Sequence, residues 1–315
     1  MQRRTFFGAA FAGLGSAASA KPAKPRVGDI PMRTLGRTGQ KLTCIGMGGA
    51  RFHLIPFDEG TAVVRRAYEL GINYFDMARS YGDGHAEQVY GGAIPPFRKD
   101  IFLTTKSGKR TRKEAEAELD LSLKLMKTDH VDLWQMHGVN KMADIDQIFA
   151  PGGAIEAFEA AKKAGKCRFI GYSNCRDPEV HVAMLKHAER FDTALMPLHV
   201  ADTSFSDSPQ MSFEKTALPA AIERGVGIFA IKVFGNAFLL RTFSAGDCLR
   251  YTLSLPVNAA PLGFNTIGQL EDDVRVAQNF KPLSTEAMAA LRARAGASKF
   301  DAIHGPALEY WKTRD

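Results

Sequence analysis

Short apolar runs and amphipathic stretches alternate along this chain, and this alternation limits its fold more than any other feature. Eight apolar runs of strand length occur, at residues 44–47, 72–75, 101–105, 131–136, 169–172, 194–198, 227–231 and 259–262. Between them lie stretches with one charged face, whose periodicity predicts helices, notably at residues 58–70, 113–126, 155–164, 178–190 and 213–223. Strands that alternate with helices in this way are predicted to lie parallel in one sheet, with the helices as crossover connections.

Eight such units in series, with no evident linker between them, predict an α/β domain of the (β/α)8 type, which is a closed eight-stranded barrel. The main alternative is an open doubly wound sheet, whose dinucleotide-binding form has a G-x-G-x-x-G turn after its first strand. Residues 46–49, Gly-Met-Gly-Gly, lack that spacing and favour the barrel. A β-hairpin at residues 32–35 and 41–43 is predicted to precede the barrel, and a short helical tail capped by Ser284 to follow it.

The first twenty residues are predicted to be a signal peptide. Arg3 and Arg4 precede a Gly- and Ala-rich apolar stretch, which ends in the small-residue cleavage sequence Ala-Ser-Ala at residues 18–20. The paired arginines resemble a twin-arginine export signal, which engages the twin-arginine translocation machinery and carries folded cargo; an ordinary secretory signal is the alternative. We therefore expect a periplasmic protein with a linker at residues 21–31 and a single domain at residues 32–315.

Composition and charge exclude several classes of protein. The chain is 45% hydrophobic and 24% charged and has no run of about 20 apolar residues, so we expect no stable membrane insertion after signal removal. The formal net charge of +7 is spread along the chain, which indicates mild attraction to anionic ligands and no nucleic-acid partner. The four cysteines form no C-x-x-C pair and have no His at zinc-ligand spacing, so no metal site is expected.

Four polar residues stand at or just after the ends of the second, third and fourth predicted strands: Asp76, Tyr81, Lys106 and His137. Because the carboxyl ends of parallel strands meet at one end of a barrel, these side chains can form one site. An ammonium beside a phenol favours the phenolate, and a carboxylate can hold the ammonium in place. Lys106 paired with Asp76 is therefore expected to lower the pKa of Tyr81 from about 10, which suits a general acid working near neutral pH.

The motifs around these residues resemble those of the aldo-keto reductases. Residues 71–82, Gly-Ile-Asn-Tyr-Phe-Asp-Met-Ala-Arg-Ser-Tyr-Gly, look like the signature of that family. Three later landmarks agree with it, namely Thr105-Lys106, residues 132–137 and residues 171–174. The resemblance runs from about residue 32 to about residue 282. Residues 230–236 and 249–257 look like those of a bacterial branch of the family that is often preceded by export signals.

The resemblance implies a (β/α)8 barrel that transfers hydride from a reduced nicotinamide cofactor to a small aldehyde or ketone. Within that reaction Tyr81 is the general acid, and Lys106 lowers its pKa. Asp76 pairs with Lys106, and His137 orients the substrate carbonyl. Negative charge builds on the carbonyl oxygen as hydride arrives, so a proton donor and a hydrogen-bond donor are the residue types that the chemistry needs.

The same resemblance implies a set of cofactor contacts and several departures from the usual pattern. Ser173 and Asn174 would hydrogen-bond the nicotinamide carboxamide. Leu195 stands where a Gln is common, and Ile231 stands where many members stack a Tyr. The candidate cofactor-binding residues are Ser173, Asn174, Lys232, Phe234, Gly263, Gln269 and Asp273.

The residues expected at the adenosine end of the cofactor also depart from the usual pattern of the family. Gly263 and Gln269 stand where a Lys and an Arg frequently hold the adenosine 2′-phosphate, so Lys232 or Arg275 would have to supply the cation. The acidic pair at residues 272–273 could instead suit the ribose hydroxyls of NADH. We expect NADP as the cofactor, by the habit of the family, with NAD as the alternative.

Two other functions compete with a carbonyl reductase. The first is a cofactor-binding regulatory or accessory protein with little turnover. The second is a barrel isomerase or hydrolase, which would need a metal cluster or paired carboxylates at strand ends, and the sequence shows neither. Substrate contacts are expected from the loops after the strands, at residues 51–53, at Trp134 with residues 138–140, and at residues 202–208.

Overall fold

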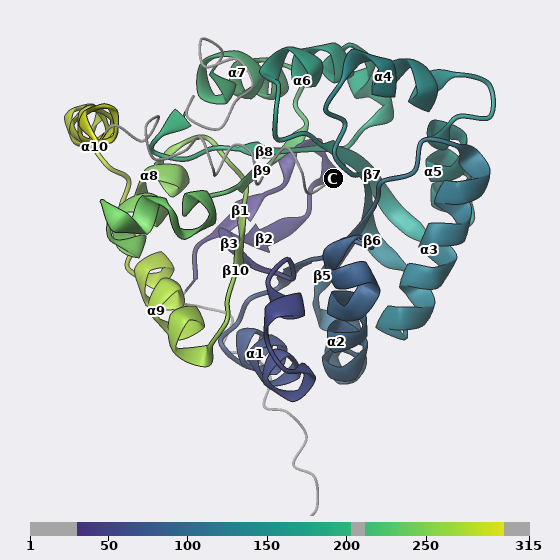
Figure 1. The fold of residues 1–315 in the computed structure, drawn as a ribbon, viewed down its shortest axis with the longest axis horizontal. Helices are drawn as coiled ribbons and strands as arrows, with labels where there is room; N and C mark the ends of the chain where they lie inside the picture. The colour runs from purple at the N-terminus through teal and green to yellow at the C-terminus, as the bar shows by residue number, and fades with distance from the viewer. Residues whose placement is uncertain (1–29, 203–211, 299–315) are drawn as a thin grey trace, which may run out of the picture.

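The computed structural model describes residues 30–202 and 212–298 (Figure 1). The predicted signal peptide, most of the predicted linker and most of the candidate loop at residues 202–208 lie outside the described residues. None of the helices in the described ranges is long and apolar enough to cross a membrane.

Eight parallel strands form a barrel with helices around it (Figure 1). The strands are β3 (Ile45–Gly48), β4 (Tyr74–Asp76), β5 (Phe102–Ser107), β6 (Val131–Met136), β7 (Cys167–Ser173), β8 (Thr193–Pro197), β9 (Gly227–Ile231) and β10 (Ala260–Gly263). They are hydrogen-bonded in the order β10-β3-β4-β5-β6-β7-β8-β9, and an isolated bridge between Phe229 and Ala259 brings β9 beside β10. The predicted (β/α)8 barrel is confirmed, and each of the eight apolar runs overlaps one of these strands.

The helices cover the outside of the barrel. They are α1 (Phe57–Glu69), α2 (His85–Ala93), α3 (Arg112–Met126), α4 (Met142–Phe149), α5 (Ala154–Lys163), α6 (Pro178–Met184), α7 (Leu218–Glu223), α8 (Ala245–Ser254), α9 (Ile267–Gln278) and α10 (Thr285–Ala297). The stretch predicted as one helix at residues 213–223 begins instead as a π-helix, Phe213–Ala217, before α7. Pro219 accounts for the change, because proline fits the first turn of an α-helix but not its interior.

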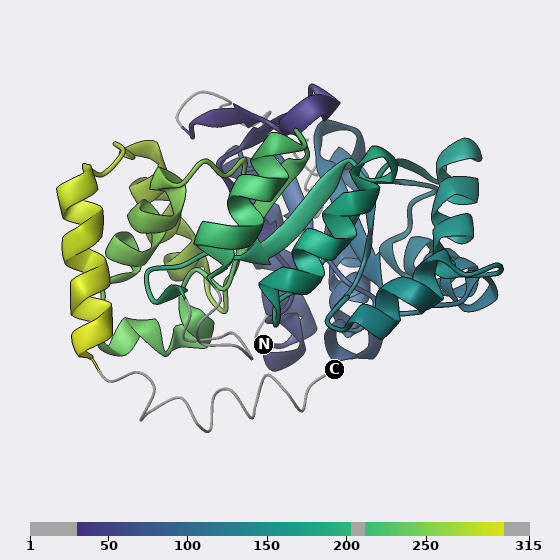
Figure 2. The ribbon, with the colours of Figure 1, turned by 90° about the horizontal axis from the view of Figure 1, so that it is seen from above.

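A β-hairpin of β1 (Met32–Thr34) and β2 (Lys41–Thr43) closes one end of the barrel, as predicted (purple in Figure 2). Leu35 and Leu42 are fully buried and join the apolar cluster inside the barrel. Arg37 donates hydrogen bonds to the carbonyl oxygens of Ala188 and Phe191, which precede β8. The hairpin thus covers the amino ends of the strands and leaves their carboxyl ends as the open end of the barrel.

Alternate residues of each strand face the barrel interior and the helices. Tyr74, Phe102 and Leu133 belong to the inner cluster and lie towards the hairpin. Trp134 faces the opposite way and stacks on Phe158 of α5, with ring centroids 3.7 Å apart. Trp134 is 1% exposed. The predicted substrate contact from Trp134 is therefore wrong, because its side chain belongs to the packing between barrel and helices.

Candidate active site

A buried polar layer crosses the barrel interior towards the open end. Asp76 ends β4, and its Oδ2 accepts a hydrogen bond of 2.6 Å from Lys106 Nζ on the neighbouring strand β5. The other carboxylate oxygen accepts hydrogen bonds from Thr104 Oγ1 at 2.8 Å and from Tyr74 OH at 3.3 Å. Lys106 Nζ also donates to the carbonyl oxygen of Met77 at 2.6 Å. The predicted pairing of Lys106 with Asp76 is present, and the ion pair is almost inaccessible, with side-chain exposures of 1% and 5%.

Tyr81 and His137 stand together next to this ion pair. Lys106 Nζ lies 5.3 Å from the centroid of the Tyr81 ring. The rings of Tyr81 and His137 are nearly perpendicular, with centroids 5.7 Å apart. The structure therefore brings the four predicted catalytic residues to the open end of the barrel, from β4, β5 and the loops that follow β4 and β6.

The turn after Tyr81 depends on a glycine. Gly82 has a φ of +59°, in the left-handed region that side chains rarely adopt, and a Cβ atom there would lie 2.6 Å from His53 Cβ. The turn leads directly into α2 at His85. A side chain at position 82 would thus push apart the loop after β3 and the loop that carries Tyr81.

The pKa of Tyr81 moves in the direction opposite to the sequence-based expectation. Burial raises the pKa of the Tyr81 phenol well above its ordinary value, and the nearby groups Asp76 and Cys175 add to the rise. Lys106 does not reverse the shift, because its ammonium is directed at Asp76 and at the carbonyl oxygen of Met77. Tyr81 therefore keeps its proton throughout the neutral pH range.

His137 is neutral in this site. Burial, together with the positive charges of Lys106, Arg110 and Lys232, lowers the pKa of His137 to about 3. Its Nδ1 lies 3.2 Å from Ser80 Oγ, a contact in which either atom can carry the hydrogen. A neutral imidazole can donate one hydrogen bond, but it cannot serve as a strong proton source at neutral pH. Sequence reasoning did not identify Ser80 as a partner of His137.

Arg110 is a second residue that sequence reasoning missed. Its Nη2 donates to the carbonyl oxygens of His137 at 3.0 Å and Gly138 at 2.8 Å, and its Nη1 donates to that of Gly108 at 3.0 Å. Arg110 therefore holds the loop after β6, which carries His137. No motif could have revealed this contact, because its acceptors are backbone carbonyl groups that every residue possesses.

The predicted carboxamide contacts are engaged within the protein. Ser173 Oγ accepts from the backbone N–H of Gly138 at 3.1 Å and donates to the carbonyl oxygen of Met136 at 3.3 Å. Asn174 is fully buried, and its Nδ2 donates to the carbonyl oxygen of Asp177 at 2.8 Å. As placed here, the Asn174 amide braces the turn that precedes α6. Its predicted contact with a nicotinamide would require that turn to open.

The remaining candidate cofactor residues differ in their surroundings. Lys232 is half-buried after β9, with a φ of +60°, and it contributes to the low pKa of His137. Phe234 is partly buried and packs against the hydrophobic core. Gln269 Oε1 accepts from the backbone N–H of Asn265 at 2.9 Å. Asp273 is 5% exposed on α9, and burial beside Asp272 raises its pKa to about 7, so it is poorly placed for a ribose hydroxyl.

The charge at the open end suits an anionic cofactor better than a cation. The groups that lower the pKa of His137 are all cationic, namely Lys106, Arg110 and Lys232. Within residues 30–202 and 212–298, no group of three His, Cys, Asp or Glu side chains is arranged to hold a metal ion. These cationic side chains therefore suit a dinucleotide cofactor, because its phosphates are negatively charged.

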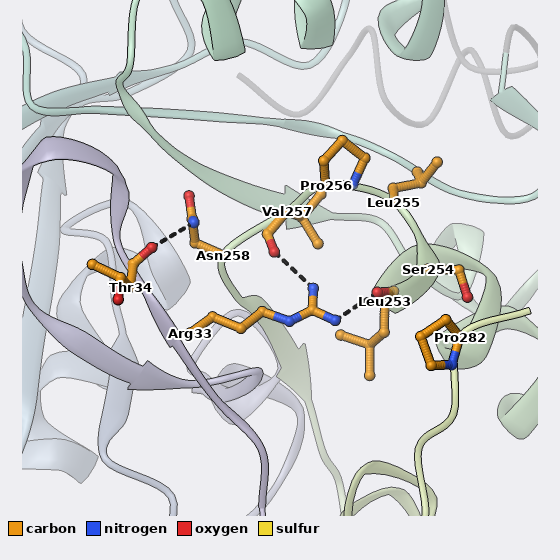
Figure 3. Close-up of a pocket in the computed structure, with 9 residues that line it drawn as sticks. All are labelled: Arg33, Thr34, Leu253, Ser254, Leu255, Pro256, Val257, Asn258 and Pro282. Carbon is orange, nitrogen blue, oxygen red and sulfur yellow. Dashed lines mark hydrogen bonds between the residues drawn. The ribbon is translucent and has the colours of Figure 1, made fainter.

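A cavity of about 580 Å³ lies beside the hairpin, away from the residues described above (Figure 3). Arg33 of β1 lines it, but both ends of its guanidinium are occupied by hydrogen bonds to the carbonyl oxygens of Val257 (2.7 Å) and Leu253 (2.6 Å). Asn258 Nδ2 donates to the carbonyl oxygen of Thr34 at 2.7 Å. These contacts join the hairpin to α8 and the segment that follows it, and they place no reactive group in the cavity.

A buried histidine should make the free energy of unfolding fall in mild acid. His181 is fully buried between Tyr172 OH (3.0 Å) and the carbonyl oxygen of Leu195 (3.2 Å), and burial lowers its pKa to about 4. In the unfolded chain a histidine binds a proton near pH 6.5. The unfolded state then binds more protons between about pH 6.5 and pH 4, so the free energy of unfolding falls as pH falls through that window. His137 acts in the same direction.

For His181 alone we expect the free energy of unfolding to fall by about 2 kcal/mol between pH 7 and pH 5. One proton bound only by the unfolded state changes this free energy by about 1.4 kcal/mol per pH unit. Urea unfolding at the two pH values measures it. His181→Asn is the control, since it should reduce the difference by about that amount. An unchanged difference in the variant would show that His181 does not carry this pH dependence.

Comparison with known proteins gives a consistent family and fold. The model of the Aldo/keto reductase family matches residues 44–247. The chain is 32% identical over 155 residues to L-galactose dehydrogenase of Arabidopsis thaliana, an alignment that covers 45% of this chain and 48% of that protein. The chain thus spans about half the length of the curated relatives matched first.

Two solved structures share the fold. An aldo-keto reductase of Bacillus halodurans in its holo form has a TM-score of 0.68 at 23% identity, over 85% of this chain and 96% of that one. An aldo-keto reductase of Klebsiella pneumoniae in complex with NADPH has a TM-score of 0.66 at 20% identity, over 83% and 94%.

Proposed function

Because this chain belongs to the aldo/keto reductase family, we propose that it is an NADP(H)-dependent oxidoreductase that reduces a small aldehyde or ketone, with Tyr81 as the proton donor. The observation that carries the proposal is the convergence of Tyr81, His137 and the Lys106–Asp76 ion pair at the open end of the barrel. Residues that meet there come from separate strand–helix units, and such ends carry the active sites of (β/α)8 enzymes.

The reduced nicotinamide, when bound, supplies the hydride. The chain supplies the proton and the electrostatic stabilisation. As negative charge develops on the carbonyl oxygen, Tyr81 donates its proton, because its raised pKa keeps the hydroxyl protonated at neutral pH. An alkoxide is a stronger base than a phenolate, so the transfer remains favourable despite the raised pKa. His137, neutral and with Ser80 Oγ at its Nδ1, donates a hydrogen bond to the same oxygen through Nε2.

The Lys106–Asp76 ion pair limits the cost of the charge that this transfer leaves behind. Loss of the proton makes Tyr81 a phenolate, and the Lys106 ammonium, 5.3 Å from the ring centroid, attracts that charge. Asp76 holds the ammonium in position through the 2.6 Å contact. The carboxylate is in turn held by Thr104 and Tyr74. Positioning by this buried layer makes the attraction available without rearrangement during the reaction.

The proposed cofactor is NADP(H). The cations near His137 suit its phosphates, and a structural neighbour from Klebsiella pneumoniae is described in complex with NADPH. Lys232 and Phe234 after β9, and the segment of Gly263 to Gln269, are the residues proposed to lie along it. Ser173 and Asn174 are proposed to hold the carboxamide once the turn at Asn174 opens.

The test is oxidation of NADPH by the purified protein with a panel of small aldehydes and ketones, followed by absorbance. Turnover with one or more of them supports the proposal. The second function, a cofactor-binding accessory protein, has one observation in its favour, since one relative is named as a putative potassium channel subunit beta in Schizosaccharomyces pombe. Tight NADPH binding without turnover across the panel would favour that function, and absence of binding would contradict both.

We also propose that the protein is exported to the periplasm by the twin-arginine machinery. The support is sequence alone, in Arg3 and Arg4 and the apolar stretch that follows them. Exchange of both arginines for lysine should leave the precursor in the cytoplasm, whereas the unaltered chain should be cleaved and recovered in the periplasmic fraction. Export of the lysine variant at the normal rate would contradict this route.

A further inference from the structure

Arg51 occupies a space that only a glycine at position 263 leaves open. Arg51 follows β3, and Gly263 ends the neighbouring strand β10, so residues distant in the sequence are adjacent at the rim of the open end. A Cβ atom on residue 263 would stand 2.6 Å from Arg51 Cγ, closer than real contacts of this kind. The side chain of Arg51 and a side chain at position 263 therefore exclude one another.

The guanidinium of Arg51 keeps most of its donors available. Its Nε donates a long hydrogen bond of 3.4 Å to Asn265 Oδ1. Across the described part of the chain, its two Nη groups have no hydrogen-bond or ion-pair partner. Arg51 is half-buried, so its position is defined while its outer edge faces solvent.

The acidic residues of the adjacent helix α9 do not compensate this charge. Glu271 pairs with Arg66 at 2.8 Å, and Asp272 pairs with Arg275. Asp273 is turned into the protein, on the face that includes Leu270 and Val274, and is only partly ionised near neutral pH. An anion at this rim therefore meets the uncompensated charge of Arg51.

We propose that Arg51 binds the adenosine 2′-phosphate of NADP(H), in the place of a cation at position 263. The inference rests on the proposed function, because it requires a dinucleotide along this rim. A phosphate monoester is a dianion with several acceptor oxygens, and a guanidinium can bind two of them through parallel N–H groups. NADH has a hydroxyl at the same place and gains little from Arg51. Arg51 thus sets the preference for NADP(H) over NAD(H).

The experiment measures the affinities of the full chain for NADPH and NADH by fluorescence titration or calorimetry. Arg51→Gln should weaken NADPH binding about 10- to 100-fold, which corresponds to the loss of a charged hydrogen-bonded pair, and change NADH binding less than twofold. The difference in NADPH affinity between the unaltered chain and Arg51→Gln should be smaller at high salt, because salt screens charges at the solvent-exposed rim. Arg112→Gln is the matched control, because Arg112 is an arginine on α3 that is paired with Glu116 and is not a candidate for the cofactor site; it should leave both affinities unchanged.

Two further variants test the geometry. Gly263→Ala keeps Arg51 but places a Cβ where its side chain lies, so it should also weaken NADPH selectively. The double variant Arg51→Ala with Gly263→Lys moves the cation to the other strand and should restore part of the NADPH affinity lost in Arg51→Ala. Circular dichroism and thermal unfolding verify that each variant is folded.

The outcomes separate this inference from the proposed function. Equal weakening of NADPH and NADH by Arg51→Gln would overturn it, since Arg51 would then serve a part that both cofactors share. A preference of the unaltered chain for NADH would overturn it as well. In both cases carbonyl reduction could still occur. The first result would leave the proposed function intact, and the second would change only its cofactor, from NADP(H) to NAD(H). Failure of the unaltered chain to bind either dinucleotide would overturn the proposed function together with this inference.

Discussion

Exchange of Tyr81 for Phe should lower kcat for carbonyl reduction by about 10²- to 10⁴-fold, the usual contribution of a general acid. Under the proposed function, the hydroxyl of Tyr81 is the proton source at neutral pH, because burial keeps it protonated. His137 cannot replace it, since its pKa of about 3 leaves it without a second proton. Steady-state oxidation of NADPH with the best substrate of the panel measures the effect. Affinity for NADPH should remain within about twofold.

A matched control is available for this exchange. Tyr68→Phe removes a hydroxyl that donates to Asp100 Oδ2 at 3.1 Å, on the outside of the barrel. It should leave kcat within about twofold, as is usual for changes away from an active site. If Tyr81→Phe kept more than a tenth of the activity, a group other than Tyr81 would have to deliver the proton.

Removal of one partner of the Lys106–Asp76 ion pair should be the most destabilising single change in the site. Asp76→Leu leaves an ammonium in the barrel interior, where the residue is 1% exposed, and also removes the acceptor of Thr104 and Tyr74. Breaking a buried pair in this way costs about 3–5 kcal/mol of the free energy of unfolding. For a domain of this size the melting temperature should fall by roughly 10 °C. Urea and thermal unfolding measure both quantities.

The double variant Asp76→Leu with Lys106→Met tests whether the cost arises from the unpaired charge. It also lacks the acceptor for Thr104 and Tyr74, so the comparison with Asp76→Leu isolates the ammonium. We expect the double variant to be more stable than Asp76→Leu by about 2 kcal/mol or more, because an apolar pair replaces an isolated charge. Equal stability of the two variants would show that Lys106 is not held charged in the folded protein. Both should be inactive.

The cluster of Asp76, Tyr81, Lys106 and His137 could be predicted because its signals are local. Asp76, Lys106 and His137 each end or follow an apolar run, and parallel strands in a barrel present their carboxyl ends together. Strand periodicity also constrains the direction of the Trp134 side chain. Residues 133, 135 and 137 share one side of β6 and its extension, so Trp134 had to face the helices. Its packing on Phe158 follows from that alternation.

The direction of the Tyr81 pKa shift could not be predicted in the same way. Neighbouring charges were visible as motifs, but the cost of burying a phenolate depends on everything packed around the ring. That burial outweighs the attraction of Lys106, which is already directed at Asp76. Tyr81 is therefore not a phenol of lowered pKa, as the sequence predicted, but one that stays protonated at neutral pH.

The eight strand–helix units and the four polar residues at strand ends could be predicted from periodicity and short motifs, because both signals lie in neighbouring residues of the chain. The tertiary structure alone decided which groups meet across units. Arg51 against Gly263, Arg110 against the carbonyl oxygens of His137 and Gly138, and Ser80 against His137 Nδ1 are contacts between distant segments. The distances between charged groups and the burial of each group determine the pKa values, and both are fixed only when the barrel has folded. The rim beside Gly263, which has no cation among its neighbours in the sequence, therefore holds Arg51 in the folded chain.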